Sequence, residues 1–135
     1  MAFTEAEQQF LTDHRWAVLT TLRGDGTPVS SMVAFARDGD SFVVSTPGMT
    51  YKRRSVENDD RVNLCVISNA EPFNFVTVEG TAKIVTDDLE RQTRLVFANI
   101  EGTGFELPED LPGWLAKQQR VILQIQPQRS HSVIR

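Results

Sequence analysis

The residues of this chain that are best suited to chemistry lie between Ser45 and Arg61. A segment rich in β-branched residues leads there into a Thr-Pro-Gly-Met-Thr turn, and the basic run Lys52-Arg53-Arg54 follows. Hydroxyl groups, free backbone N–H groups at a helix N-terminus and neighbouring cations together supply the donors and the positive field that bind phosphate. This stretch therefore predicts a binding site for an anionic ligand.

The basic run is a local exception in an acidic chain. The sequence holds 14 Lys and Arg residues against 18 Asp and Glu residues, which gives a net charge of −4. Nucleic-acid binding normally needs a wide basic face, so the acidic balance argues against a nucleic-acid partner. Taken alone, the run is more typical of a solvent-exposed helix face whose cations pair with Glu57, Asp59 or Asp60.

Length and composition predict one globular domain over residues 1–135. The chain has 40% hydrophobic and 24% charged residues, which is ordinary for a folded domain. No apolar run approaches the roughly 20 residues that a membrane span requires, and the N-terminus lacks the pattern of a signal peptide. We therefore expect a cytoplasmic protein that does not insert into a membrane.

Residues that could ligate a metal are too few to predict a metal site. Cys65 is the only cysteine, which excludes an internal disulfide and every multi-cysteine zinc site, and its apolar neighbours favour a buried position. His14 and His131 lie far apart in the sequence. The chain also lacks a His-Glu-x-x-His pair, a dinucleotide-binding glycine pattern, a phosphate-binding lysine loop and a nucleophile-elbow serine.

The first half of the chain predicts a helix followed by an antiparallel meander. Thr4 and Glu7 have the spacing of a capping box, which starts a helix over residues 4–13. Three segments rich in β-branched and aromatic residues are separated by glycine turns at residues 24–26 and 38–40. These segments predict strands over residues 16–22, 29–37 and 41–46.

The second half predicts two further helices among longer strands. Thr50 can cap a helix that runs to about residue 58, and strands are expected over residues 61–68 and 73–85, with a bulge or bend at Gly80. A helix then begins at residues 86–88 and ends near Gly102, where a surface loop reaches to Gly113. The chain finishes with a short segment over residues 114–119, a strand over residues 120–125 and a tail from Pro127.

Six or seven mostly antiparallel strands with three short helices favour a mainly β fold, a small barrel with helical plugs, over a parallel βαβ sheet. Residues 19–28, which contain Leu-Thr-Thr-Leu-Arg and then Gly-Thr-Pro, would form the first strands of this barrel. Residues 42–54 contain the basic run, and residues 78–82 would lie in the strand that closes the barrel. The order and spacing of these stretches resemble the pyridoxamine 5'-phosphate oxidase-like split β-barrel flavoproteins. The short chain and the Leu-Thr-Thr-Leu-Arg opening are most similar to the branch that uses the deazaflavin coenzyme F420.

The resemblance implies a cofactor site at the basic run. Lys52 matches the family lysine that meets the cofactor phosphate, and groups of the preceding turn line the same pocket. Many relatives have an arginine two residues before that lysine, where this chain has Thr50, so Arg53 is the candidate to replace it and Arg54 is a weaker match. Two residues of the second strand match positions that flank the cofactor ring. The complete predicted set is Ser31, Met32, Ser45, Thr46, Thr50, Lys52, Arg53 and Arg54.

The resemblance also implies a homodimer with the cofactors at the subunit interface, so that a partner chain completes each pocket. Trp114 or the segment near His131 is a candidate contribution from the partner. The implied activity is that of a reductase, which passes a hydride from reduced F420 to an unsaturated or conjugated small molecule. Because the cofactor ring carries out the hydride chemistry, no dedicated acid or base is required.

Two alternatives stay open at this point. An FMN-dependent oxidoreductase of the same fold would use the same phosphate site, because both cofactors carry a phosphate on a ribityl chain. The deazaflavin also has an anionic lactyl-oligoglutamate tail, which calls for a further basic groove, and Arg23, Arg37 and Arg61 are its candidates. A non-catalytic module that binds a flavin, haem or another tetrapyrrole is the second alternative.

Overall fold

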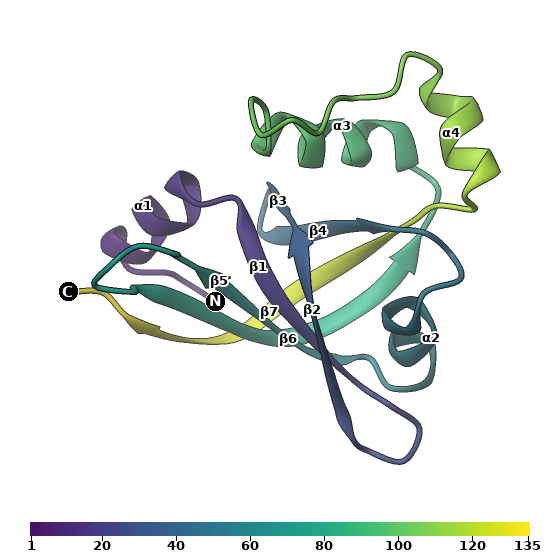
Figure 1. Ribbon diagram of the computed structural model, residues 1–135. Coiled ribbons are helices and arrows are strands. Elements are labelled where there is room, and N and C mark those ends of the chain that lie inside the picture. The colour runs from purple at the N-terminus through teal and green to yellow at the C-terminus, as the bar shows by residue number, and fades with distance from the viewer.

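Seven antiparallel strands form one curled sheet in the computed structural model, which describes residues 1–135 (Figure 1). The strand order is β2-β1-β5-β6-β7-β4-β3, and every neighbouring pair runs antiparallel. The fold is therefore mainly β, as predicted, and it is that of a split barrel. The strands are β1 (Trp16–Leu22), β2 (Pro28–Ala34), β3 (Ala36–Asp38), β4 (Ser41–Thr46), β5 (Arg61–Ile67), β6 (Phe75–Val85) and β7 (Val121–Val133).

Four short helices accompany the sheet, one more than the sequence predicts. The predicted capping box is present at α1, where the Thr4 hydroxyl accepts the Glu7 N–H at 3.1 Å and the Glu7 carboxylate accepts the Thr4 N–H at 2.9 Å. The additional helix is α4, which begins inside the predicted loop because the Asp110 carboxylate accepts the N–H of Gly113 at 3.2 Å. None of the four is long and apolar enough to cross a membrane. The helices are α1 (Glu5–Asp13), α2 (Tyr51–Asn58), α3 (Leu89–Asn99) and α4 (Leu111–Lys117).

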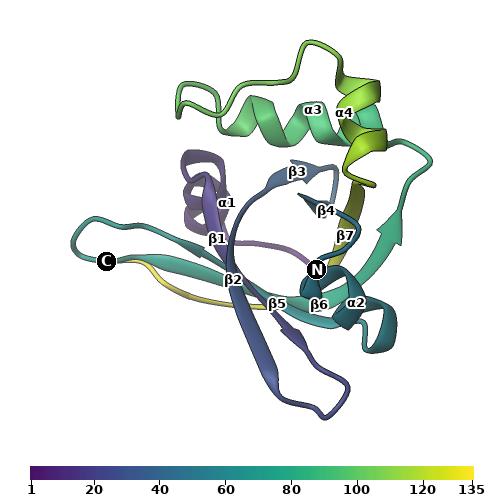
Figure 2. The ribbon, with the colours of Figure 1, turned by 45° about the vertical axis from the view of Figure 1, so that its right-hand side comes forward.

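One residue, Phe35, links the two edges of the sheet. β2 pairs with β1 whereas β3 pairs with β4, so the single strand predicted over residues 29–37 is wrong and is broken at Phe35. The Phe35 side chain is fully buried, and Figure 2 shows the chain curving there from β2 into β3. β3 pairs with β4 only as far as Val43, so residues 44–46 have no partner strand on that side. The unpaired edges of β2 and of the end of β4 form the split of the barrel.

The longest strand is β7, which corrects the predicted strand over residues 120–125 and its tail. β7 pairs with β6 from Ile122 to Val133, and the predicted bulge lies between Glu79 and Gly80. A Cβ at Gly80 would overlap the carbonyl oxygen of Gln126, so glycine lets the two strands approach there. Pro127 lies beyond the residues of β7 that pair with β4 and pairs with Gly80 at the bulge, a position at which a strand tolerates proline.

Buried and more exposed side chains alternate along the strands, which gives the sheet an inner face and an outer face. β1 and β5 bury every second residue, and these join Phe10 and Leu11 of α1 and Val56 of α2 in one apolar core. Of the predicted helical plugs, α1 and α2 therefore contribute to the core of the barrel. Cys65 has the opposite parity and is half-buried on the outer face, so its predicted burial is wrong.

Specific contacts fix α3 and α4 beyond β3 (Figure 1). Arg91 of α3 donates to the Asp38 carboxylate of β3 at 3.0 and 2.8 Å, and the Asn99 amide donates to the carbonyl of Phe35 at 2.7 Å. The Phe97 ring of α3 meets the Trp114 ring of α4 edge to face, with centroids 5.8 Å apart. Trp114 is thus held against α3.

Candidate functional site

The turn between β4 and α2 gathers the predicted hydroxyl groups. The Thr46 and Thr50 hydroxyls lie 2.9 Å apart, and that of Thr50 donates to the carbonyl of Pro47 at 3.1 Å. Thr50 also accepts the N–H of Arg53 at 3.4 Å, so it caps α2 as predicted. Thr46 is fully buried. Both threonines therefore shape the turn, while their neighbour Ser45 is half-buried on β4 and faces a cation.

Lys52 lies half-buried in the first turn of α2, beside a second cation, Arg120. Burial lowers the pKa of Lys52, and the charge of Arg120 lowers it further. Burial also lowers the pKa of Arg120. Neither side chain forms an ion pair with a carboxylate. Two cations that repel each other and lack an acidic partner are a site that a bound anion would stabilise.

Arg120 is oriented by three contacts. Its Nε donates to Oε1 of Gln118 at 2.8 Å, and its Nη1 donates to Oγ of Ser45 at 3.4 Å. The guanidinium carbon lies 4.2 Å from the centre of the Trp114 ring, a cation–π arrangement. Since an arginine has five N–H groups and these contacts use two, the others remain to bind a ligand.

Sequence reasoning did not identify Arg120. A single arginine at the start of a predicted strand carries no pattern of its own, and the pairing of Ser45 with Ile122 in β4 and β7 is what brings Arg120 to the basic run. Trp114, considered above as a contribution from a partner, contacts Arg120 of its own chain. His131 lies on β7, where its ring is 5.8 Å from that of Phe75.

Arg53 and Arg54 line a separate open pocket on a neighbouring side of α2. Arg53 pairs with Glu57 at 2.7 Å, as expected for a solvated helix face, yet its Nε is buried without a hydrogen-bond partner. Arg54 is exposed and donates to the carbonyl of Met49 at 3.2 Å. Lys52 does not line this pocket. The pocket has a volume of about 450 Å³ and is lined by Gly48, Met49, Arg53, Arg54, Gln119 and Val121.

Ser31 and Met32 lie on opposite faces of β2. Ser31 pairs with Leu19 and shares its core-facing side, whereas Met32 is on the outer face and 62% exposed. Met32 borders a pocket of about 210 Å³ together with Trp16 and Ile67. The structure therefore does not bring these two residues to one side of a single protomer.

Of the three arginines considered for an anionic tail, only Arg23 lies near the basic run. Its guanidinium carbon is 5.9 Å from the centre of the Tyr51 ring of α2. Arg37 is half-buried between aromatic rings, with its guanidinium carbon 4.7 Å from the centre of the Phe42 ring. Arg61 pairs with Asp59 at 2.7 Å, and hydrogen bonds from Arg61 lower the pKa of Asp59 to about 2.

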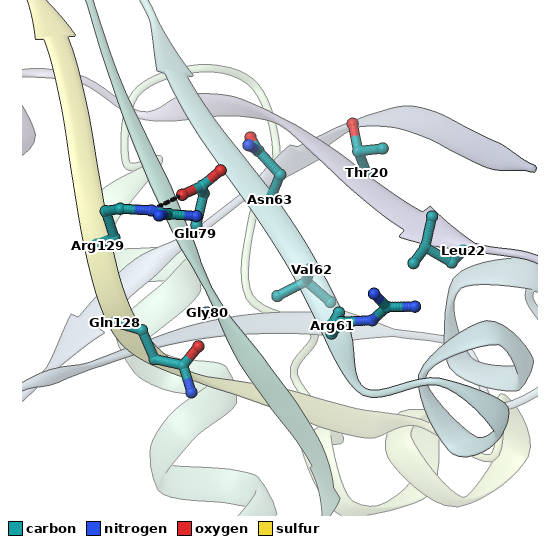
Figure 3. A pocket seen from close by; sticks show the side chains of 9 residues that line it. All are labelled: Thr20, Leu22, Arg61, Val62, Asn63, Glu79, Gly80, Gln128 and Arg129. Atoms are coloured by element: carbon teal, nitrogen blue, oxygen red, sulfur yellow. Dashed lines mark hydrogen bonds and ion pairs between the residues drawn. The ribbon is translucent and has the colours of Figure 1, made fainter. Parts of the chain in front are cut away.

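The outer face of the sheet is hollowed next to the bulge of β6 and β7. Figure 3 shows Thr20, Asn63 and Glu79 side by side across β1, β5 and β6, with Arg129 of β7 paired to Glu79. The hollow has a volume of about 310 Å³, and both of the arginines that line it, at 61 and 129, are paired with carboxylates. Nowhere in the structure do three His, Cys, Asp or Glu side chains gather in a way that could hold a metal ion.

Comparison with known proteins gives matches over nearly the whole chain. The sequence profile of the family described as pyridoxamine 5'-phosphate oxidase matches residues 3–134. The F420H(2)-dependent biliverdin reductase of Mycobacterium tuberculosis (strain CDC 1551 / Oshkosh) is 30% identical over 123 residues, which cover 89% of this chain and 80% of that protein.

Solved structures share the fold. One described as an F420 reductase aligns with a TM-score of 0.77 and 25% identity, over 96% of this chain and 98% of its own. The haem storage protein of Vibrio cholerae aligns with a TM-score of 0.72 and 18% identity, over 99% of this chain and 95% of its own. At that identity the haem protein is comparable in fold alone.

Proposed function

Since the chain belongs to the pyridoxamine 5'-phosphate oxidase family, we propose that it is an oxidoreductase that uses the deazaflavin coenzyme F420 to reduce an unsaturated or conjugated small molecule. Two similar proteins support this choice of cofactor, because the relative that is 30% identical and the structure with a TM-score of 0.77 are both named for F420. The observation that carries the proposal is the pair of half-buried cations, Lys52 and Arg120, without an acidic partner.

The residues around this pair fit a phosphate group. A phosphate between Lys52 and Arg120 would offset their mutual repulsion, and the Ser45 hydroxyl and the unused N–H groups of Arg120 are donors at the same place. A hydrogen bond to a charged group contributes about 1.5–3 kcal/mol. Three or four of them would supply much of the about 8 kcal/mol that corresponds to micromolar binding.

The protein's own task is then to position the ring and the acceptor. When bound, the reduced cofactor supplies a hydride with its two electrons and is thereby oxidised, while the acceptor takes up one proton from solvent. Ser31 and the unpaired backbone groups of β2 and of residues 44–46 face the split and are the candidates to orient the ring. Orientation of two reactants in contact, with water excluded, accounts for a large part of such a rate enhancement.

We further propose that two copies pair through the outer face of the sheet. Val18 stands between Met32 and Cys65 in register, and the neighbouring Ile67 and Trp16 border the same face. Met32 is 62% exposed in the single chain, and a second copy would remove this apolar strip from water. In such a dimer, Met32 would reach the cofactor of the partner chain and not its own.

Cofactor titration with a charge variant tests the proposed function. The purified protein is titrated with F420 and with FMN, and binding is followed by fluorescence. Lys52→Ala should weaken the affinity by about tenfold or more, which corresponds to about 1.4 kcal/mol. The melting temperature of the empty protein should stay nearly unchanged, and Lys83→Ala, which removes an exposed lysine of β6, serves as the control.

The outcomes separate the proposal from its rivals. Tight F420 binding with acceptor-dependent oxidation of the reduced cofactor supports it. FMN that stays bound through purification and turns over would favour the FMN-dependent oxidoreductase. Binding without turnover against a broad panel of acceptors would favour a binding module. An unchanged affinity in Lys52→Ala would contradict the assignment of the phosphate site.

A further inference from the structure

A small pocket beside the outer face of the sheet contains a histidine that the phosphate site does not use. His14 is the C-cap of α1 and is half-buried. An apolar wall with a few polar side chains is typical of a pocket that binds a small molecule. This pocket has a volume of about 210 Å³ and is lined by Asp13, His14, Arg15, Trp16, Met32, Ile67 and Asn69.

The hydrogen bonding of His14 determines which of its ring nitrogens is free. Nδ1 lies 2.7 Å from the carbonyl oxygen of Phe10. Since a carbonyl can only accept, Nδ1 carries a hydrogen and donates it, and Nε2 is the atom that gains and loses a proton. The imidazole also stacks on the ring of Phe10, with centroids 3.7 Å apart and planes at 18°. Both contacts hold the ring in one orientation.

No charged side chain of the protein is bonded to this imidazole. The Gln9 amide donates to both oxygens of the Asp13 carboxylate at 3.0 Å, and Arg15 is exposed. Neither Asp13 nor Arg15 forms an ion pair, and the other side chains that line the pocket are apolar or neutral. A proton that leaves Nε2 therefore passes to solvent or to a molecule bound in the pocket.

Met32 connects this pocket with the proposed reaction. It lines the pocket and is 62% exposed, and in the proposed dimer it would reach the cofactor of the partner chain. A small molecule in the pocket would then lie beside that cofactor, and the second copy would cover it. Hydride transfer needs two reactants in contact, so a molecule held here is suitably placed to be the acceptor.

We propose that this pocket binds the acceptor and that His14 is a catalytic acid, which passes a proton from solvent to the acceptor through Nε2. The inference rests on the proposed function and deepens it. As the hydride forms a new C–H bond with the electron pair taken from the reduced cofactor, a π bond of the acceptor breaks and negative charge develops on its heteroatom. The Nε2–H bond then breaks, the proton binds to the heteroatom, and Nε2 regains a proton from solvent.

Two variants separate this role from the contact at the end of α1. The amide of His14→Asn can replace Nδ1 and donate to the Phe10 carbonyl, whereas His14→Gln gives up that contact, and both lack the acid. The oxidation of reduced F420 by 2-cyclohexen-1-one and by 1,4-naphthoquinone is measured. In both variants kcat should fall by about a hundredfold. Thr4→Ala, which removes the capping box at the other end of α1, is the control and should keep its kcat.

The pH dependence of kcat is a readout that a purely structural role would not change. In the unaltered protein kcat should fall as the pH rises through the neutral range, because only the imidazolium form can donate from Nε2. In His14→Asn the remaining kcat should stay level over the same range. Asp13→Asn should keep the pH profile of the unaltered protein, since the Asp13 carboxylate is not the acid.

Spectra of the protein without cofactor test the geometry separately. The histidine side-chain signal that is absent from His14→Asn should show, in ¹H–¹⁵N spectra, a neutral ring with its hydrogen on Nδ1, and a hydrogen on Nε2 would overturn the inference. An unchanged kcat in His14→Asn would also overturn it and leave the proposed function in place. If the unaltered protein reduces neither these two acceptors nor any other of the panel, the proposed function fails and the role of His14 fails with it.

Discussion

Lys52 in the first turn of α2 and Arg120 immediately before β7 are two half-buried cations, close enough for the charge of Arg120 to act on Lys52. Burial lowers the pKa of Lys52, and the charge of Arg120 adds to this effect. Neither has an acidic partner, so a phosphate would supply the opposite charge that the empty protein lacks at this place. Such an arrangement favours the binding of an anionic ligand.

The lowered pKa of Lys52 predicts a pH dependence of anion binding. The affinity for inorganic phosphate should fall as the pH rises, beginning below the ordinary lysine value of 10.5, because neutral Lys52 no longer attracts the anion. Inorganic phosphate loses its second proton near neutral pH, so it stays dianionic over the alkaline range in which Lys52 becomes neutral. In Lys52→Arg the affinity should stay level, because guanidinium remains charged. ³¹P NMR titrations at several pH values measure the phosphate affinity of both proteins. An equal fall in affinity in the unaltered protein and in Lys52→Arg would contradict the role of Lys52.

The stability of the empty protein should change with pH in the opposite sense. The folded pKa of Lys52 lies below its unfolded value, so the unfolded chain binds this proton more tightly. The free energy of unfolding therefore gains a contribution as the pH rises through the folded pKa. In Lys52→Met, the free energy of unfolding measured with urea should not show this rise with pH. A rise of the same size in that variant would show that another group is responsible.

Trp114 is predicted to support anion binding through Arg120. In Trp114→Leu the cation–π contact at 4.2 Å is lost, and the affinity for phosphate should fall by about threefold to tenfold. The affinity of Trp114→Phe for phosphate should lie between those of the unaltered protein and Trp114→Leu. Phe97→Leu is the control, because it loosens the packing of α3 against α4 without touching Arg120. If Phe97→Leu weakens binding as much as Trp114→Leu does, the stacking has no specific role.

Gly48 is predicted to be intolerant of a side chain. In Gly48→Ala the new Cβ would overlap the backbone oxygen of Gln119, and the overlap should cost about 1–3 kcal/mol in the free energy of unfolding. Gly24→Ala is the matched control, since its Cβ would find its nearest neighbour, the Asn58 side chain, at 3.6 Å. Urea denaturation measures the free energy of unfolding of both variants. Equal values would contradict the prediction, because they would mean that the backbone at Gly48 and Gln119 moves apart at little cost.

The outer face of the sheet is predicted to mediate dimerisation. Met32→Glu places a charge at the most exposed residue of the apolar strip and should shift the protein from dimer to monomer. Met49→Glu is the control, because Met49 is 71% exposed in the β4–α2 turn and not on that face. Light scattering coupled to size-exclusion chromatography reports the mass. A dimer that survives Met32→Glu, or a monomer already in the unaltered protein, would contradict this interface.

Local signals in the sequence predicted the parts of the fold that depend on neighbouring residues. The capping box of Thr4 and Glu7, the cap at Thr50 and the bulge at Gly80 are all confirmed, because each follows from the chemistry of a few adjacent side chains. The position of Lys52 at the start of a capped helix followed from the same kind of signal. These features needed no knowledge of long-range contacts.

Features that depend on distant segments could not be predicted in this way. The break at Phe35 arises because β2 and β3 pair with different strands, and Pro127 lies at the bulge, where β4 has already ended its pairing with β7. Arg120 belongs to the candidate site through the pairing of β4 with β7 and through Trp114. No residue near Arg120 in the sequence signals either contact.

The one-residue connection at Phe35 has a consequence for how this chain can vary in length. If one residue were added or deleted there, every side chain of either β2 or β3 would move to the opposite face of the sheet. The segment between α3 and α4 lies outside the sheet and carries no such constraint. Natural variants should therefore differ in length over residues 100–110 and keep one residue between β2 and β3.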